Sequence, residues 1–277
     1  VGEPCASEGQ WHPRFGDAHA LVGPICSLHT MQLFDRWPTE LNAAISPSAD
    51  LPSLGQLSQK QALPFSRVSG DGRWYAAGVA RLLVEMQQPC IVVSSSTGRW
   101  WSEVARLVTS TLKRRGISTT EVDSANAVQQ VPEIMRKLAS PLTVCLLDPS
   151  VQEETLRIIL NLILPTTGSN GVFARTNEGD LASLLETTSK RADGKIHSVR
   201  LQPPEISPDG FRHLRRVRAG VSDGLQSGYV TQMYDAVLAA ASVVEAASAE
   251  GHPRSQLGSA LRKVDLEGST GRVRFDS

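Results

Sequence analysis

The stretch over residues 21–54, LVGPICSLHTMQLFDRWPTELNAAISPSADLPSL, decides the fold of this chain. A short apolar run opens it and stops at Gly23-Pro24, and Ser27 follows as a natural N-cap for a helix. Apolar residues recur at helical spacing over residues 31–37, and a second apolar run at residues 43–45 ends in another polar turn. The pattern predicts a strand, a helix and a second strand, with a polar turn at the same end of both strands.

These two polar turns indicate a ligand site. In an open α/β sheet, ligands bind beyond the carboxyl ends of parallel strands, where free backbone N–H groups and helix N-termini favour anions. Ser27 in the first turn and Ser48 in the second are expected to face that crevice. The alternative is that each serine only caps a helix, but two such turns in tandem favour binding.

The rest of the chain alternates short apolar runs with amphipathic segments. Strands are predicted at residues 90–93, 119–122, 142–147, 171–174, 196–201 and 273–275, and helices at residues 71–86, 100–115, 127–138, 151–164, 181–190 and 229–250. Such alternation implies parallel strands joined by right-handed helical crossovers. The polar turn at residues 94–98 repeats the design of the two N-terminal turns.

Charge and motifs exclude several classes of function. Lys plus Arg and Asp plus Glu both number 28, so the net charge of zero gives no electrostatic reason to expect a nucleic-acid or anionic-membrane partner. The sequence contains no Gly-X-Ser-X-Gly elbow, no phosphate-binding loop and no histidine pair at metal-binding spacing. We therefore predict a protein with no enzymatic activity, no cofactor and no metal.

Segments that could meet a membrane are also missing from the sequence. No apolar run is long enough to span a bilayer, and the first residues are polar and do not resemble a signal peptide. We therefore expect contact with a membrane only through segments outside this sequence.

The cysteine pattern fits neither a disulfide scaffold nor a zinc site, because four cysteines are too few and wrongly spaced. Cys90 and Cys145 lie in apolar strands, where a cysteine is usually a small buried hydrophobe. Cys5 and Cys26 lie in polar, turn-like surroundings. Cysteine arithmetic leaves both a disulfide and two unpaired thiols open for this pair.

Several motifs resemble one known superfamily. They are GPICS at 23–27, ISPSADLPSL at 45–54, PFSRV at 64–68, YDAV at 234–237, LRKV at 261–264 and GSTGRVRFD at 268–276. In order and spacing the chain is similar to the type I periplasmic-binding-protein, or Venus-flytrap, superfamily. That superfamily includes bacterial branched-chain amino-acid binding proteins and the extracellular domains of class C G-protein-coupled receptors. It also includes natriuretic-peptide receptors and the amino-terminal domains of ionotropic glutamate receptors.

The resemblance implies an α/β fold with two lobes, each a mainly parallel sheet flanked by helices. It places residues 1–88 and 204–277 in the first lobe and residues 89–203 in the second. A complete member would begin with a further strand–helix–strand–helix section and would continue beyond residue 277. We therefore expect the sequence to be truncated at both ends.

The resemblance also implies a ligand site. Ser27, Ser48, Ala49 and Asp50 match positions that hold the α-carboxylate and α-ammonium of an amino acid in many members. Asp50 departs from the usual Ser or Thr, and its charge would favour an ammonium over a carboxylate.

Three further positions are candidate contacts, namely Trp100, Asp148 and Tyr229. Trp100 matches an aromatic that often closes over the ligand. It could equally be a core residue of its helix, with Trp101 beside it as the rival aromatic. Receptor members commonly bond a loop cysteine to the cysteine before the ligand-contacting serine, which implies a disulfide between Cys5 and Cys26.

The function that the resemblance implies is an extracellular, ligand-sensing domain of a membrane receptor. It would bind an amino-acid-like molecule between two lobes, signal by closing, and form a homodimer or heterodimer through the first lobe. Two alternatives stay open. One is a flytrap without ligand that acts as a dimerisation or assembly module, and the other is a soluble solute-binding protein of a transporter, periplasmic in a bacterium.

Overall fold

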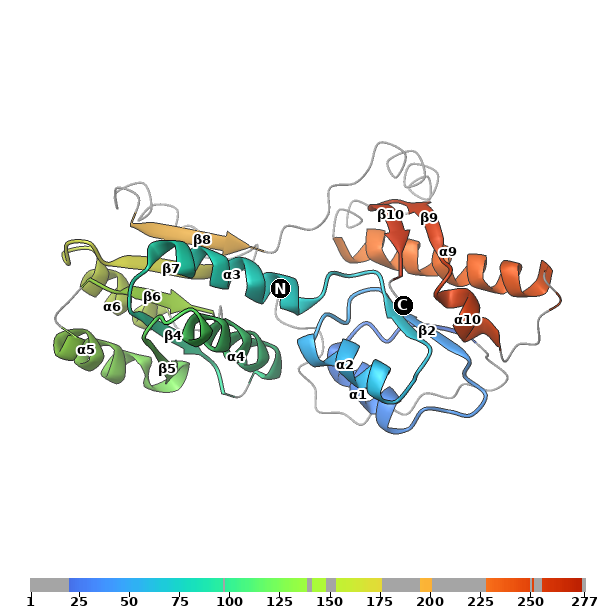
Figure 1. Ribbon diagram of the computed structural model, residues 1–277, viewed down its shortest axis with the longest axis horizontal. Helices are drawn as coiled ribbons and strands as arrows, with labels where there is room; N and C mark the ends of the chain where they lie inside the picture. The colour runs from blue at the N-terminus through green and yellow to red at the C-terminus, as the bar shows by residue number, and fades with distance from the viewer. Residues whose placement is uncertain are drawn as a thin grey trace. The chain divides into compact units, whose positions relative to one another are not determined.

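The computed structural model describes residues 20–96, 98–138, 141–147, 153–175, 195–200, 228–249, 251 and 256–275. The chain divides into two compact units. One unit lies within residues 72–202, and the other combines residues before 72 with residues after 202 (Figure 1).

The unit formed by residues before 72 and after 202 is built on a three-stranded parallel sheet in the order β1-β2-β3. Its strands are β1 (Ala20–Val22), β2 (Ala43–Ser46) and β3 (Phe65–Arg67), and the connecting helices are α1 (Ser27–Asp35) and α2 (Pro52–Lys60). The strand, helix and strand expected over residues 21–54 are confirmed. Helix α2 and strand β3 are additions to that expectation, because α2 contains Gly55 and few apolar residues and β3 is only three residues long.

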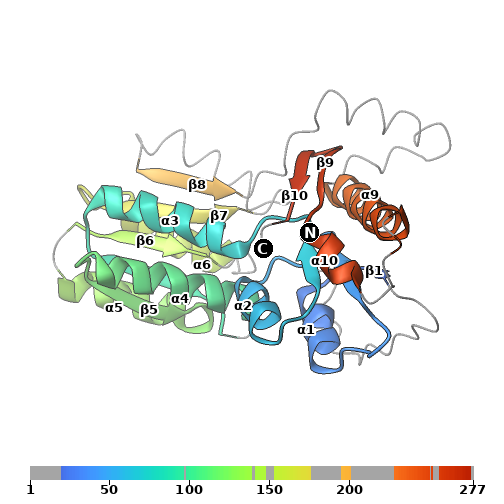
Figure 2. The same ribbon diagram turned by 45° about the vertical axis from the view of Figure 1, so that its right-hand side comes forward.

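Side chains of β2 alternate between two cores, as the pleat of a strand requires. Ala44 packs with Leu33 and Leu41 on the side of α1, whereas Ala43 and Ile45 pack in a second cluster. That second cluster is formed by α9 (Gly228–Ala249), α10 (Leu257–Leu261) and the hairpin of β9 (Asp265–Gly268) with β10 (Gly271–Arg274). The sheet is therefore covered on both faces by helices that come from opposite ends of the sequence (Figure 2).

Asp235 fixes the hairpin to α9. Its buried carboxylate accepts four hydrogen bonds, from the backbone N–H and the hydroxyl of both Ser269 and Thr270, at 2.5 to 3.0 Å. A Cβ atom at Gly268 would lie 2.7 Å from this carboxylate, so only glycine permits the approach. The motifs YDAV and GSTG thus form one structural feature.

The other unit carries a five-stranded parallel sheet in the order β5-β4-β6-β7-β8. Its strands are β4 (Cys90–Ser94), β5 (Thr119–Asp123), β6 (Thr143–Leu146), β7 (Asn170–Arg175) and β8 (Ile196–Arg200). Its helices are α3 (Gly72–Met86), α4 (Arg99–Arg114), α5 (Ala127–Leu138) and α6 (Glu153–Ile163), with a short 3₁₀ turn at Ser124–Asn126. Parallel pairing by helical crossovers is confirmed for this unit. The helix expected at residues 181–190 lies outside the described residues.

Helices cover both faces of this sheet as well, with α3 and α4 over one face and α5 and α6 over the other (Figure 1). Ile91 and Val93 of the interior strand β4 belong to the core formed with α5 and α6. Because both faces are covered, β4 reads as a continuous apolar run. The sequence placed the first lobe boundary after residue 88, whereas the units divide between residues 71 and 72, because α3 packs against α4.

We predict that Asp235→Ala lowers the free energy of unfolding by about 3 kcal/mol, because four donors of the buried hairpin lose the carboxylate that accepts them. Urea unfolding followed by circular dichroism would measure the loss. Glu85→Ala is the matched control, since the Glu85 side chain is 62% exposed and its ion pair with Arg81 lies on the surface. A loss for Asp235→Ala no larger than that of the control would contradict this role of Asp235.

Candidate functional site

The two polar turns singled out by the sequence lie side by side. Strands β1 and β2 pair in parallel with Val22 opposite Ile45, so the loops that follow them leave the sheet at the same edge. Gly23 extends the pairing by donating its N–H to the carbonyl of Ile45 at 2.8 Å, with a positive φ of 127° that favours glycine. We call residues 23–27 the first turn and residues 46–51 the second turn.

Three serine hydroxyls connect the two turns. Ser46 donates to the carbonyl of Pro24 at 2.5 Å, and Ser48 donates to the carbonyl of Ile25 at 2.9 Å. In the other direction, Ser27 Oγ accepts the backbone N–H of Leu51 at 3.1 Å. The prediction that Ser27 and Ser48 share one crevice edge is therefore consistent with their bonds, which run from each turn to the other. Ser46 is a member of this network that the sequence analysis did not single out, because it occupies the last position of a strand.

Because of these bonds, the two candidate serines differ in the hydrogen bonds that they can still form with a ligand. The Ser48 hydroxyl already donates its hydrogen to the carbonyl of Ile25, so it can only accept a hydrogen bond from a ligand. Ser27 Oγ accepts a hydrogen bond from the Leu51 N–H. Its own hydroxyl hydrogen can be donated to a ligand, because no acceptor for it is found among the described residues. Ser27 is thus suited to a carboxylate, and Ser48 is suited to an ammonium.

Ala49 and Asp50 lie between these serine contacts. Ala49 is fully buried, its N–H donates to Ser46 Oγ at 2.9 Å, and its carbonyl accepts from Arg67 at 3.2 Å. The backbone groups of Ala49 are therefore engaged inside the turn. Asp50 is half-buried and is the acidic group of the second turn.

In the other unit, the turn at residues 94–98, of which residues 94–96 and 98 are described, lies at the point where the strand order reverses. Strand β4 has β5 on one side and β6 on the other, so the crossovers that follow β4 and β5 leave on opposite faces. Ligands of open α/β sheets bind at such a switch point. Within this turn, Gly98 donates its N–H to Ser95 Oγ at 3.2 Å.

Asp123, at the end of β5, holds this turn from the neighbouring strand. Its carboxylate accepts the backbone N–H of Ser96 at 3.2 Å and that of Ala125 at 2.8 Å. Hydrogen bonding to Ser96, followed by that to Ala125, lowers the pKa of Asp123 below its ordinary value of 3.8. The sequence offered one signal for this residue, an acidic side chain directly after a short strand.

Trp100 lies in the core of its unit. Only 8% of the residue is exposed, and its ring contacts Trp101 and Tyr75 at centroid distances of 4.3 and 5.5 Å. Its Nε1–H is buried and finds no hydrogen-bond partner in the described part of the chain. The alternative in which Trp100 is a core residue agrees with this packing. Burial, and then the nearby Cys145, raise the pKa of the Tyr75 hydroxyl well above its ordinary value.

The other candidates are only partly covered by the structure. Asp148 and Cys5 lie outside the described residues. Tyr229 is the second residue of α9, and its side chain is not described. Cys26 is buried at the N-cap of α1, and its pairing with Cys5 stays a prediction.

The free cysteines of the described residues are Cys90 and Cys145, which lie on the neighbouring strands β4 and β6. Burial raises the pKa of the Cys90 thiol to about 12 and raises that of Cys145 well above its ordinary value. Both are therefore buried hydrophobes, as the sequence predicted.

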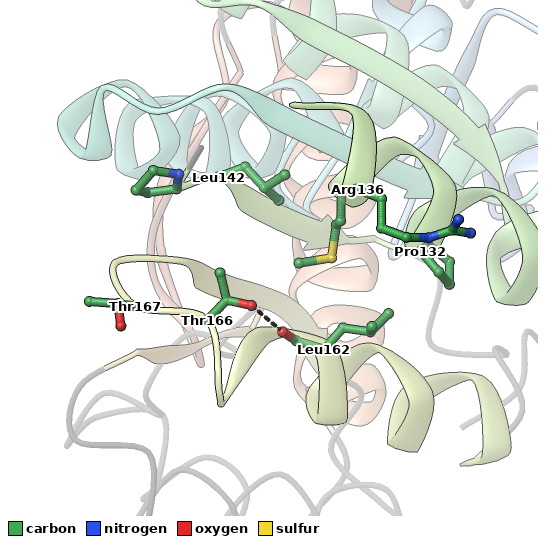
Figure 3. Close-up of a pocket in the computed structure, with 8 residues that line it drawn as sticks. Pro132, Arg136, Leu142, Leu162, Thr166 and Thr167 are labelled. Carbon is green, nitrogen blue, oxygen red and sulfur yellow. Dashed lines mark hydrogen bonds between the residues drawn. The ribbon is translucent and has the colours of Figure 1, made fainter. Parts of the chain in front are cut away.

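Two cavities of this unit lie at the opposite edge of its sheet. One, of about 440 Å³, opens between α5 and α6 near Arg136, Leu142 and Thr166, whose hydroxyl donates to the carbonyl of Leu162 at 2.7 Å (Figure 3). The other, of about 550 Å³, is lined by residues 87–89 and 115–118. Both lie next to residues that precede strands, so they are remote from the turn at residues 94–98.

Metal ligands and membrane spans were also sought in the described residues. No group of three or more His, Cys, Asp or Glu side chains could hold a metal ion in that part of the chain. Among the helices described, none combines the length and the apolar character needed to cross a bilayer.

Sequence comparison finds no matching protein-family model and no significantly similar curated protein. Solved structures do match. An ABC transporter substrate-binding protein from Desulfitobacterium hafniense in complex with Leu is 15% identical, with a TM-score of 0.61, over 93% of this chain and 73% of its own. A second structure of an ABC transporter substrate-binding protein from that organism is 14% identical, with a TM-score of 0.63 and the same coverage. A Rhodospirillum rubrum protein assigned to a branched-chain amino acid ABC transporter is 17% identical, with a TM-score of 0.62, over 93% of this chain and 72% of its own.

These similarities establish the fold. The chain shares with these transporter proteins an α/β fold with parallel sheets flanked by helices, and that fold class, expected from the sequence, is confirmed. At this level of identity, the similarity shows the fold alone, and function has to be inferred from the residues of the site.

We predict that protonation of Asp123 loosens the turn at residues 94–98. Because the folded-state pKa is lowered, the carboxylate stabilises the turn above pH 3.8, and this contribution is lost as the pH falls through the folded pKa. The amide shifts of Ser96 and Ala125 in NMR spectra should titrate together with a midpoint below 3.8. In Asp123→Asn this transition should vanish, and its persistence would show that another group causes it.

A thiol count tests the cysteine assignments. In native protein near pH 8, Cys90 and Cys145 should not react with Ellman's reagent, because they are buried and their thiols stay protonated. In denaturant without reductant these two alone should react, and all four cysteines should react after reduction. Reaction of all four before reduction would rule out the disulfide between Cys5 and Cys26.

Proposed function

We propose that this protein is a non-enzymatic solute-binding protein that takes a small amino-acid-like ligand at its first and second turns. The proposal is carried by one observation, the bonding of Ser27 and Ser48 between turns at the carboxyl ends of adjacent parallel strands. It is supported by the fold, because solved structures with this fold include one of a substrate-binding protein in complex with Leu. The protein would act outside the cytoplasm, as the sequence resemblance implies.

The two ends of an amino acid match what the turns offer. The α-carboxylate would accept the proton of Ser27, and the α-ammonium would donate to Ser48 Oγ and to the carboxylate of Asp50. An acid in place of the usual Ser or Thr makes the ammonium the more strongly held of the two groups. We therefore infer a ligand with a free amino group and not a simple carboxylate or a sugar.

The receptor ectodomain expected from the sequence has less support than the solute-binding alternative. Two of the similar solved structures named above are of ABC transporter substrate-binding proteins and the third is assigned to an ABC transporter, and none of the three is described as a receptor. The expected dimer through the first lobe has no support from these comparisons and stays a prediction.

A ligand-free assembly module is the second candidate. The internal engagement of both backbone groups of Ala49 favours it, because that residue then offers a ligand no free hydrogen-bonding group. The two candidates differ in one measurable property, the binding of amino acids.

Isothermal titration calorimetry with the standard amino acids, leucine included, tests the proposal. We expect at least one amino acid to bind, and Ser48→Ala to weaken that binding by about tenfold, since one hydrogen bond to a charged group is lost. Ser110→Ala is the control, because Ser110 is an exposed serine of α4 whose hydroxyl donates to the carbonyl of Leu107 in its own helix. Absence of heat and of any thermal shift with every amino acid would favour the assembly module. Binding that Ser48→Ala leaves unchanged would place the ligand elsewhere.

A further inference from the structure

Arg67 connects the second turn to the loop that follows β3. Its Nη1 donates to the carbonyls of Ala49 at 3.2 Å and Leu51 at 3.1 Å, and its Nη2 forms an ion pair with Asp71. Only 11% of the Arg67 side chain and 8% of the Asp71 side chain are exposed. A buried, planar guanidinium with these acceptors is fixed in position, and a lysine could not reproduce its geometry.

The bonds of Arg67 complete a continuous series along the second turn. The peptide group between residues 48 and 49 is held through the Ala49 N–H by Ser46, and the next one is held through the Ala49 carbonyl by Arg67. The group between residues 50 and 51 is held through the Leu51 N–H by Ser27, and the group after it is held through the Leu51 carbonyl by Arg67. Side chains thus hold four consecutive peptide groups around Asp50, and Arg67 holds two of the four.

The other contacts of the turn cannot replace Arg67. Ser46, at the end of β2, holds only the Ala49 N–H, and Ser27 belongs to the first turn, so it can move with that loop. Arg67 stands at the end of β3, which pairs with β2 through Ser46 opposite Arg67. Arg67 therefore anchors the turn to the sheet from a neighbouring strand. Asp71 neutralises the charge of Arg67 and restricts the movement of its guanidinium group.

We propose that Arg67 is the positioning residue of the ligand site, and that Asp71 holds it in place for that task. Arg67 does not touch the ligand. It holds the peptide group before Asp50 and the peptide group after Leu51, so the carboxylate and the Ser48 hydroxyl are presented in one arrangement before a ligand arrives. Preorganisation of this kind raises affinity because the turn need not be ordered on binding. The effect on affinity rests on the proposed function, whereas the effect on the order of the turn does not.

The first experiment is hydrogen–deuterium exchange of the unliganded full chain. In Arg67→Lys and Arg67→Ala we expect the amides of residues 49–51 to exchange about tenfold faster, while those of α9 and of the five-stranded sheet keep their rates. Arg81→Ala is the matched control, because the Arg81 side chain is 84% exposed and forms an ion pair with Glu85 of its own helix. Unchanged exchange at residues 49–51 in both Arg67 variants would overturn the proposal.

If Arg67→Ala unfolds the unit, exchange in α9 rises too. In that case the Asp71→Asn variant is used to test the proposal. This variant keeps the guanidinium but frees it from its ion pair, so exchange at residues 49–51 should still rise with α9 unaffected. Equal rates in Asp71→Asn and the wild type would then count against the proposal.

The second experiment measures affinity and its rescue. Leucine, or whichever amino acid binds the wild type, should bind Arg67→Ala about tenfold more weakly or worse, and millimolar methylguanidinium should restore part of the affinity. Methylammonium, which lacks the planar fork, should not restore it. A loss that neither cation repairs would indicate a general structural defect and contradict the positioning role. If no amino acid binds the wild type, the proposed function fails, and the exchange experiment alone judges Arg67.

Discussion

The parallel pairing of β1 with β2 is the constraint on which the candidate site depends. Parallel strands end at the same edge of a sheet, so the register that sets Val22 opposite Ile45 also sets the first turn beside the second. The serine bonds between the turns follow from this placement, because each buried polar group at the edge needs a partner and finds it on the neighbouring loop. An antiparallel arrangement of the same strands would have separated Ser27 from Ser48.

The same pairing explains why the unit combines segments from before residue 72 and after residue 202. A three-stranded parallel sheet exposes an apolar face on each side, and α1 with α2 can cover only one of them. The other face is covered by α9, whose alanines let it approach Ala43 and Ile45 closely. Asp235 then ties the C-terminal hairpin to α9, so a single buried carboxylate fixes the outer end of this layer.

The two units stabilise a polar turn in the same way but with different residues. In each, a polar turn after a buried strand is held by a side chain from the end of the next strand in the sheet, Arg67 in one unit and Asp123 in the other. Arg67 is a donor to backbone carbonyls, whereas Asp123 is an acceptor of backbone N–H groups. The fold is shared with solved structures that are only 14 to 17% identical, because such folds need apolar strands and satisfied loop ends and not particular residues.

The sequence by itself determined the alternation of strands and helices, the parallel pairing and the edge at which the polar turns lie. Those features follow from local periodicity and from turn residues such as Gly23-Pro24, which act over a few positions. Only the tertiary structure decided the roles of Ser46, Arg67 and Asp123, and it placed Trp100 in a core. These roles depend on contacts between segments distant in the chain, such as the one from Arg67 to Ala49, and no local pattern encodes which buried donor meets which acceptor.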